Sequence, residues 1–433
     1  MRKILILAAL MAWFPASASA DLFSYVKKPE ACYAWKLKSK TPTPLGTVYE
    51  LALTSQCWQG INWEHQIQVC VPPGAKPAST MLLWNQGGKA SLTSGAFGLE
   101  LARRAQAPCA LLFGIPKQPL FEGKTEDKLI AETFVRFLET KDADWPLLFP
   151  MVKSLVKAMD ALQEFTKEEL KTQVDSFVVS GASKRGWTSW LTAAADKRVM
   201  AAVPLVIDTL NIPEQMPHQL KSYGKYSDMI IDYTSRGLVP LPDTKEARLL
   251  WSWVDPYFYR DQLTLPKLII NGANDPYWAV DALNKYWDGL KGDKWVLYVP
   301  NAGHNLEEKK ADGKKDRERA IGALTAFAKF QIHHKTMPKL QWGYVSEGEG
   351  KKLQVQSDAT IQGGRLWVAQ ADSLDFRKAK WVEQPASVKG KSLDALIPVP
   401  KQGCQACFGE LDFEIDGTAF RLSTQMYVHE GKK

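Results

Sequence analysis

The central part of the chain alternates short, continuously apolar runs with stretches of helical periodicity. The apolar runs are MLLWNQ (81–86), CALLFGIP (109–116), DSFVVS (175–180), VMAAVPLVI (199–207), PKLII (266–270) and WVLYV (295–299). Helices are predicted between them over residues 97–104, 127–140, 146–165, 280–290 and 317–333, with a further helix ending at Ala195. Strands that are apolar on both faces and alternate with helices are typical of a parallel sheet covered on both sides. The pattern therefore predicts an α/β fold, doubly wound around a mostly parallel sheet.

The pattern changes on both sides of this region and once within it. Residues 49–73 alternate with period two around Gly60, which predicts an edge hairpin. Between residues 208 and 265 the alternation gives way to an aromatic, helical stretch, which predicts a cap inserted above the sheet. After Pro338, period-two segments separated by Gly, Ser and Asp predict a β-sandwich. We therefore expect an α/β domain over 21–337, with its cap at about 208–265, followed by a sandwich domain over 338–433.

The first twenty residues have the order of a secretory signal peptide. A basic start is followed by an apolar run over residues 4–14 and by the small residues Ala18, Ser19 and Ala20. The apolar run is too short to span a bilayer. We expect a cleaved chain that acts in the periplasm or outside the cell, with no membrane-spanning segment.

Charge and composition exclude some partners and leave others open. The formal net charge of +8 is spread along 433 residues, and the one dense run, 307–319, mixes both signs. Such a run is typical of a solvated helix face, so no nucleic-acid partner is expected. The pair His333-His334 has no acidic or cysteine neighbours at ligand spacing, so neither a metal site nor a cofactor is expected.

Six cysteines stand at positions 32, 57, 70, 109, 404 and 407. In an oxidising compartment an even number of cysteines favours disulfides, but their pairing does not follow from sequence. The pair Cys404-x-x-Cys407 has no second pair and no thioredoxin-like context, so a loop disulfide, or separate pairing of each sulfur, is favoured over a redox or metal pair.

The strand over 175–180 runs into Gly181-Ala182-Ser183-Lys184-Arg185-Gly186 and then into a helix. A nucleophile elbow has this construction, because its strained turn needs small residues around the serine so that strand and helix can approach closely. Arg185 stands where the common motif has its second glycine. Taken alone, a strand-to-helix turn that contains Gly and Ser is more often structural than catalytic.

Two further strand ends supply the groups that such a serine needs. The strand PKLII leads to Asp275, and the strand WVLYV leads to His304. Serine, acid and histidine occur in the chain order typical of α/β-hydrolases, and all three loops should meet at the carboxyl edge of one sheet. Asp281 and Asp255 are rival acids, weaker because one lies in a helical pattern and the other precedes a proline. We expect a catalytic triad of Ser183, Asp275 and His304.

An oxyanion hole would need two N–H donors. The backbone N–H of Lys184 is one candidate, and the loop over 85–88, with Gln86 and Gly87 at its centre, is the expected source of the second. Cations are unfavourable at a helix N-terminus, which favours a functional or paired role for the side chains of Lys184 and Arg185. Arg185, Trp187 and Trp278 are candidates for substrate binding, although tryptophans in such positions more often fill a core.

Several long motifs resemble one known family. They are LTSQCWQGINWEHQIQVCVP (53–72), SGASKRGWTSW (180–190), VDPYFYRDQLTLPKLIINGANDPYW (254–278), YWDGL (286–290), YVPNAGHNL (298–306), CFGELDFEIDG (407–417) and LSTQ (423–426). Through them the chain resembles the PhoPQ-activated pathogenicity-related protein family, which also includes an autocrine proliferation repressor. The resemblance implies an α/β-hydrolase-like fold with Ser183, Asp275 and His304 as matching positions. Cys57 and Cys70 depart from the family pattern, and a local disulfide is one meaning of that departure.

Two functions follow as hypotheses. The first is an exported serine hydrolase that acts through an acyl-enzyme on a small-molecule, carbohydrate or peptide ester. An ester is favoured over an amide because no acidic motif for a peptide amine is visible. The alternative is a catalytically silent binding or signalling protein on a hydrolase scaffold, since the family is named for regulation and phenotype.

Overall fold

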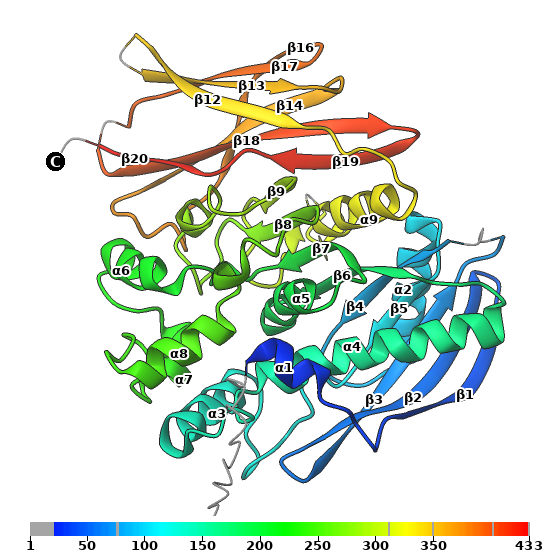
Figure 1. Cartoon of the computed structure of the whole chain (residues 1–433). Coiled ribbons are helices and arrows are strands. Elements are labelled where there is room, and N and C mark those ends of the chain that lie inside the picture. The colour runs from blue at the N-terminus through cyan, green and yellow to red at the C-terminus, as the bar shows by residue number, and fades with distance from the viewer. Residues whose placement is uncertain (1–20, 75–77, 311, 349, 401, 432–433) are drawn as a thin grey trace, which may run out of the picture.

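The computed structural model describes residues 21–431 except 75–77, 311, 349 and 401 (Figure 1). The predicted signal peptide over residues 1–20 lies outside the described residues, so export stays a prediction. Along the described part of the chain, none of the helices combines the length and the apolar composition needed to cross a bilayer.

One large mixed sheet runs through the described residues and contains fourteen of their strands. At its centre, six strands lie parallel in the order β5-β4-β6-β7-β8-β9. Their bounds are Cys109–Leu112 (β5), Thr80–Asn85 (β4), Ser176–Ala182 (β6), Val199–Leu205 (β7), Lys267–Gly272 (β8) and Lys294–Val299 (β9). Helical crossovers join these strands, so the predicted doubly wound α/β-hydrolase fold is confirmed.

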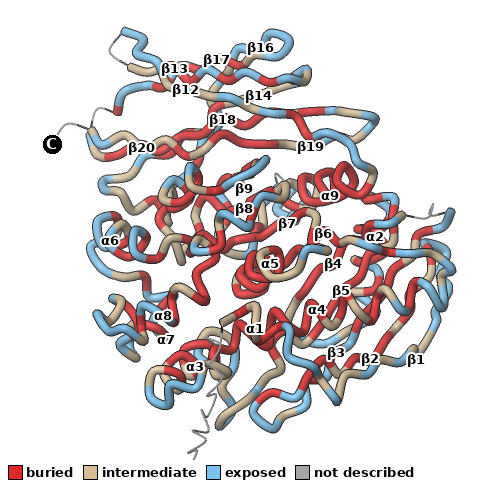
Figure 2. Tube along the Cα trace, viewed as in Figure 1, coloured by how far each residue is buried: buried red, intermediate tan, exposed pale blue. Residues whose placement is uncertain are grey.

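The continuous apolar character of the central strands follows from burial on both faces. Along β6, Phe177 and Val179 belong to one buried cluster, while Val178 between them belongs to the other. The first cluster is covered by helices α1, α3, α4 and α5, and the second by α2 and α9. Figure 2 shows the buried backbone concentrated in the central strands and in α4, α5 and α9. The helix bounds are Leu22–Lys27 (α1), Leu92–Ala105 (α2), Glu126–Thr140 (α3), Leu148–Phe165 (α4), Lys184–Ala195 (α5) and Glu318–Ile332 (α9).

The predicted N-terminal hairpin forms one wing of the sheet. Strands β2 (Gly46–Trp58) and β3 (Ile61–Val71) pair antiparallel, and β1 (Ala34–Thr43) pairs with the outer side of β2. The turn places Gln59 and Gly60 at φ 50° and 73°. Left-handed φ values at both turn residues match the right-handed twist of the flanking strands, which explains the glycine.

The segment between β7 and β8 is helical and aromatic, as predicted. It contains α6 (Ile212–Tyr223), α7 (Ile231–Thr234) and α8 (Lys245–Val254), which lie together on one side of the parallel strands (Figure 1).

The helix predicted over 280–290 is wrong, because only a single 3-10 turn, Ala282–Lys285, forms there. Two carbonyls of this turn accept hydrogen bonds from α6 and the residue before it: Gln215 donates to Ala282 and Asn211 donates to Lys285. Side chains of the inserted segment thus satisfy groups that a helix would have satisfied itself.

The C-terminal strands form two layers, one of which continues the main sheet. Strands β12 (Leu340–Glu347), β13 (Gly350–Ser357), β17 (Ser392–Ile397) and β16 (Ser387–Lys389) form a separate antiparallel sheet. The facing layer contains β14 (Gly363–Ala371), β15 (Val382–Pro385), β18 (Cys404–Ile415), β19 (Thr418–Ser423) and β20 (Tyr427–Glu430). This second layer joins the parallel strands directly, because Ser423 of β19 pairs with Val296 of β9.

All six cysteines are free thiols in the described structure. Cys57 lies opposite Asn62 near the turn of the β2–β3 hairpin, whereas Cys70 lies opposite Val48 at its other end. A disulfide between Cys57 and Cys70 therefore does not fit this hairpin.

A buried ion cluster fastens α9 to the C-terminal strands. Glu410 of β18 has no exposed side-chain surface and accepts hydrogen bonds from Arg319 of α9 and Arg365 of β14. Glu410→Ala would remove a buried acceptor from both guanidinium groups, while Arg319 would keep Glu308 and Arg365 would keep Asp412 as partners. We therefore expect the free energy of unfolding to fall by about 1.5–3 kcal/mol in urea denaturation. Glu430→Ala is the matched control, since the Lys221–Glu430 pair is more than half exposed and should lose less than about 1 kcal/mol. Equal losses in the two variants would contradict this account.

Candidate active site

Ser183 occupies a strained turn between β6 and α5. Its φ of 58° and ψ of −127° are unfavourable for any residue with a side chain. Hydrogen bonds on both sides hold the turn, because the Ser183 N–H donates to Leu205 (2.8 Å) and the Trp187 N–H donates to the Ser183 carbonyl (2.9 Å). The strain presents the serine hydroxyl at the end of the strand.

The glycines of the motif are required by close packing around this turn. A side-chain carbon added at Gly181 would lie 2.6 Å from Asn85 Nδ2 and 2.8 Å from the Arg185 backbone. At Gly186 it would lie 2.8 Å from Ile207 and 2.9 Å from the Gly181 carbonyl. The two glycines of Gly-x-Ser-x-x-Gly therefore stand at the two positions where strand and helix pack too closely for a side chain.

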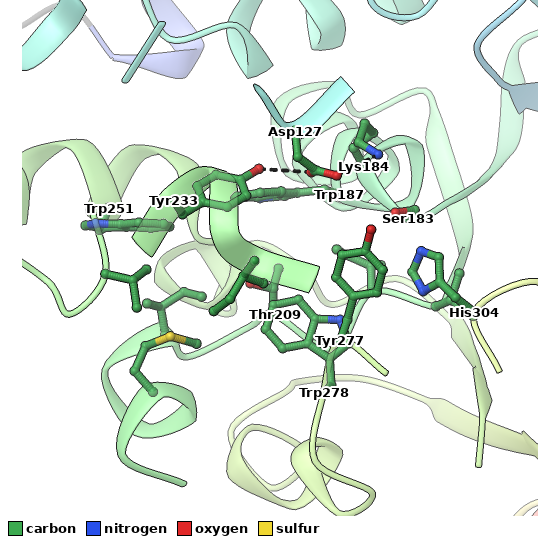
Figure 3. Close-up of a pocket in the computed structure, with 16 residues that line it drawn as sticks. Asp127, Ser183, Lys184, Trp187, Thr209, Tyr233, Trp251, Tyr277, Trp278 and His304 are labelled. Carbon is green, nitrogen blue, oxygen red and sulfur yellow. Dashed lines mark hydrogen bonds and ion pairs between the residues drawn. The ribbon is translucent and has the colours of Figure 1, made fainter. Parts of the chain in front are cut away.

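Asp275 and His304 are hydrogen-bonded to each other beside Ser183. His304 Nδ1 lies 2.8 Å from Asp275 Oδ2, and the Tyr277 N–H donates to Asp275 Oδ1 at 2.9 Å. A carboxylate only accepts, so Nδ1 is the protonated nitrogen and Nε2 is left as an acceptor. His304 Nε2 is buried and has no hydrogen-bond partner among the described residues. Ser183 and His304 line the same two cavities. Figure 3 draws one of these cavities and shows both side chains on the same side of it.

Tyr277 packs its ring against the His304 imidazole, with 4.3 Å between ring centroids and 31° between planes. Figure 3 shows the two rings side by side. Burial, followed by nearby carboxylates, raises the pKa of Tyr277 to about 12, so its ring stays neutral. One residue thus contacts the acid through its backbone and the base through its side chain. The sequence did not predict a role for Tyr277, although this aromatic residue lies two positions after the predicted acid.

The side chains of Lys184 and Arg185 are paired with acids of α3. Arg185 donates to both oxygens of Glu126 (2.6 and 2.7 Å), and Lys184 Nζ lies 2.9 Å from Glu126 and 3.1 Å from Asp127. Burial opposes ionisation of Glu126, but the hydrogen bonds and charge of Arg185 and the charge of Lys184 outweigh it and hold the pKa of this carboxyl well below its usual range. Arg185 is thus a buried ion-pair partner that also lines a groove next to Ser183, and its role in substrate binding stays a prediction.

The predicted oxyanion loop offers a narrower choice of donors than expected. The Gln86 N–H donates to the Leu112 carbonyl (2.9 Å) as an extension of the strand pairing, so it is not free. The Gly87 N–H makes no hydrogen bond within the described residues, and a side-chain carbon at Gly87 would lie 2.3 Å from Arg185 Nη2. The Lys184 N–H lies at the start of α5, where backbone donors have no partner within the helix. The backbone N–H groups of Gly87 and Lys184 are therefore the candidate oxyanion donors, while the backbone N–H of Gln86 is excluded.

The two rival acids have other partners. Asp281 accepts from His218 on α6 at 2.6 Å. Asp255 accepts from the backbone N–H groups of Asn211, Ile212 and Tyr257, which makes it an anchor for the inserted segment. Within the described residues, no group of three or more His, Cys, Asp or Glu side chains could hold a metal ion.

A segment from the C-terminal strands holds the loops that carry Asp275 and His304. Asn274 Nδ2 donates to the carbonyls of Phe376 (3.0 Å) and Ala379 (2.8 Å). Asn301 and Trp381 exchange two hydrogen bonds, of 2.8 and 2.9 Å, between the Asn301 amide and the Trp381 backbone. Both loops are thus tied to the connection between β14 and β15.

Two cavities meet at Ser183 and His304. The narrower and more enclosed of the two, the closed pocket, has a free volume of about 40 Å³. It is lined by Ser183, His304, Asp127, Lys184, Thr209, the aliphatic Val206, Ile207, Ile212, Met216, Ile230 and Val239, and the aromatic Trp187, Tyr233, Trp251, Tyr277 and Trp278. The open groove, of about 860 Å³, lies between the loop at Gln86, the start of α2 and the segment that follows His304. Trp187 and Trp278, both predicted near the substrate, line the closed pocket (Figure 3).

A second buried carboxyl, Asp208, lies behind the acid. It follows β7, accepts from Tyr286 and from Asn271 (2.6 Å), and borders the same small internal cavity as Asp275. Burial raises the pKa of Asp208 to about 7, and the charge of Asp275 adds to this effect. The Tyr298 hydroxyl and the Trp278 indole N–H have no partner among the described residues, and both side chains line this cavity.

Comparison with known proteins identifies the chain's relatives. The sequence profile of the PhoPQ-activated pathogenicity-related protein family matches residues 22–377. The chain is 32% identical over 364 residues to autocrine proliferation repressor protein A of Dictyostelium discoideum, covering 79% of this chain and 71% of that protein.

Two solved structures of hydrolases are similar to part of the chain. Acetyl xylan esterase 1 from Thermoanaerobacterium sp. JW/SL YS485 is 17% identical, with 65% of this chain and 85% of that chain covered and a TM-score of 0.47. Acylaminoacyl peptidase from Pyrococcus horikoshii is 13% identical, with 70% and 49% covered and a TM-score of 0.42.

Replacing Tyr277 should distinguish the contribution of its ring, which packs on His304, from that of its backbone N–H, which binds Asp275. Tyr277→Leu keeps the backbone bond to Asp275 but removes the aromatic face that would stabilise a positively charged imidazole, an effect of about 0.5–2 kcal/mol. We expect the rate at which a fluorophosphonate labels Ser183 to fall by about 3- to 30-fold. Tyr277→Phe keeps the face and should label at nearly the original rate; equal losses in the two variants would show that the hydroxyl, not the stacking, matters.

The buried carboxyl Asp208 should make stability depend on pH. Its pKa is about 7 in the folded protein and about 3.9 in the unfolded chain, so the folded state retains a proton that the unfolded state loses. The contribution of Asp208 to stability is therefore complete below about pH 4 and is lost as the pH rises through 7. We expect the melting temperature of Asp208→Asn, relative to the original protein, to rise between pH 4 and pH 8. The exposed Asp261→Asn should show no such trend, and a constant offset for Asp208→Asn would contradict the assignment.

Proposed function

The chain belongs to the PhoPQ-activated pathogenicity-related protein family, and from this premise and the geometry of the site we propose that it is a serine hydrolase that cleaves esters through an acyl-enzyme. One observation carries the proposal. A histidine oriented by a buried aspartate has its second ring nitrogen unpaired, and it lies beside a serine held on a strained strand-to-helix turn.

The roles follow from which atom can give or take a proton. His304 Nε2, the free acceptor, removes the proton of Ser183 Oγ as the oxygen attacks the ester carbonyl. The Asp275 carboxylate keeps the Nδ1 tautomer in place and stabilises the imidazolium that forms. The N–H groups of Lys184 and Gly87 would receive the oxygen that becomes negative. His304 then returns the proton to the leaving alcohol, and water attacks the acyl-enzyme in the same sequence.

The charges around the nucleophile favour an ester over a peptide with a free amino group. Binding such an amine would need an unpaired acid near Ser183. Asp127 is the acid that lines the closed pocket, but its carboxylate is already bound by Lys184 (3.1 Å) and by the Tyr233 hydroxyl (3.1 Å). Glu126 is bound by Arg185 and Lys184. The acids near the serine are thus neutralised.

We further propose that this hydrolase acts outside the cytoplasm, because residues 1–20 have the order of a secretory signal. A second function deserves a direct test, namely binding or signalling without catalysis. It is favoured by the name of a relative, autocrine proliferation repressor protein A, which is 32% identical.

Replacing the nucleophile separates these two functions. Ser183→Ala should abolish labelling by a fluorophosphonate and lower the hydrolysis of short p-nitrophenyl esters by at least about a thousandfold. Ser235→Ala is a matched control, because Ser235 is an exposed serine at the end of α7 that does not line either cavity; it should label and hydrolyse normally. If the original protein neither labels nor hydrolyses while a known serine hydrolase reacts in parallel, the silent scaffold is the better account.

A further inference from the structure

The two cavities at Ser183 differ in size and in exposure to solvent, and these differences indicate which half of an ester each cavity binds. We propose that the closed pocket holds the acyl group, that this group is short, and that the open groove holds a larger, polar and uncharged alcohol. The substrate would then be a short-chain acyl ester of a polyhydroxylated compound such as a carbohydrate. This inference rests on the proposed function and makes it more specific.

Departure of the leaving group decides which cavity takes which half. The acyl group stays bound to Ser183 Oγ after the first step, whereas the alcohol must leave before water can attack. The alcohol therefore needs the side that opens to solvent, which is the groove. The groove also contains Gly87, so a carbonyl oxygen directed at that amide leaves its acyl substituent free to enter the closed pocket.

The size of the closed pocket limits the length of the acyl chain. An apolar cavity of about 150 Å³ can take a benzene ring, whereas one water needs about 10–15 Å³. A free volume of about 40 Å³ therefore has room for about three small heavy atoms, which corresponds to acyl groups of about two to four carbon atoms. The walls are bulky and buried: Trp187 donates to the Val254 carbonyl (2.5 Å), and Trp251 packs edge-on against Phe134 at 5.8 Å.

The lining of the groove indicates a polar but uncharged partner. Five basic and four acidic side chains line the groove, and the fifth cation, Arg185, is paired with Glu126 outside it. Within the groove, Arg104 is paired with Glu318 and Arg317 with Glu307. An ionic alcohol would find no net charge there, while hydroxyl groups would find many donors and acceptors. Phe97 is partly exposed in the groove and packs edge-on against Trp84 at 5.7 Å, so it offers an apolar surface to a ring.

A chain-length series tests the acyl side. With p-nitrophenyl acetate, butyrate and octanoate, we expect kcat/KM to be at least about tenfold higher for the two short esters than for octanoate. Trp251→Phe enlarges the closed pocket at its end away from Ser183 (Figure 3) and removes an indole N–H that has no partner among the described residues. The variant should therefore hydrolyse esters with longer acyl chains relatively faster. Met216→Val also enlarges this pocket and can replace Trp251→Phe if that variant is unstable.

A variant of the groove is the matched control. Phe97→Ala should leave the ratio between chain lengths unchanged and should lower the hydrolysis of an O-acetylated disaccharide more than that of p-nitrophenyl acetate. Equal rates for octanoate and acetate, or a chain-length shift in Phe97→Ala but not in Trp251→Phe, would overturn the assignment of the two cavities while leaving the proposed function intact.

Covalent labelling provides a second measurement, because it requires only attack by Ser183 and not complete hydrolysis of a substrate. A methylphosphonyl fluoride should label Ser183 faster than an octylphosphonyl fluoride, and Trp251→Phe should narrow the difference. Faster labelling by the octyl reagent would overturn the assignment. Absence of both labelling and hydrolysis would overturn the proposed function, and this inference with it.

Discussion

At the turn between β6 and α5 the backbone comes so close to its neighbours that two positions have no room for a side chain. The Asn85 amide, which donates to the Ser180 carbonyl (2.8 Å), and the start of α5 enclose this turn. The strained φ of Ser183 persists because the strand, the helix and Asn85 all fix the backbone around it. The rest of the site depends on this turn, since Ser183 borders both cavities and lies beside the histidine and the candidate donors.

The charges next to the nucleophile show what this packing requires. Two cations at the start of α5 would be unfavourable for the helix and costly to bury. The start of α3 supplies Glu126 and Asp127, so the four charges neutralise one another. As a result α5, which follows the nucleophile, is tied to α3, and the charged side chains next to the serine nearly cancel one another.

The sequence predicted the parallel core because its strands are apolar on both faces, and it predicted the strand ends that carry Ser183, Asp275 and His304. It did not reveal the ion pairs of Lys184 and Arg185, because their partners lie about sixty residues away on another helix. The helix expected over 280–290 failed for a similar reason, since Asn211 and Gln215 of a distant segment satisfy its carbonyls. The stacking of Tyr277 and the use of the Gln86 amide depend on tertiary geometry, which periodicity does not describe. Local patterns thus predict elements and their ends, whereas side-chain partners distant in sequence come only from the assembled fold.

The hydrogen bonds from Asn274 and Asn301 to the connection between β14 and β15 have an evolutionary consequence. The acid loop and the base loop belong to the hydrolase sheet, yet their positions are held by a segment that follows it in the chain. The C-terminal strands could therefore not have been acquired, lost or exchanged as an independent module without altering the spacing of the two loops. A gene fusion or recombination break placed near Pro338 would separate Asp275 and His304 from the residues that hold their loops. The two parts of the chain are therefore expected to be inherited together.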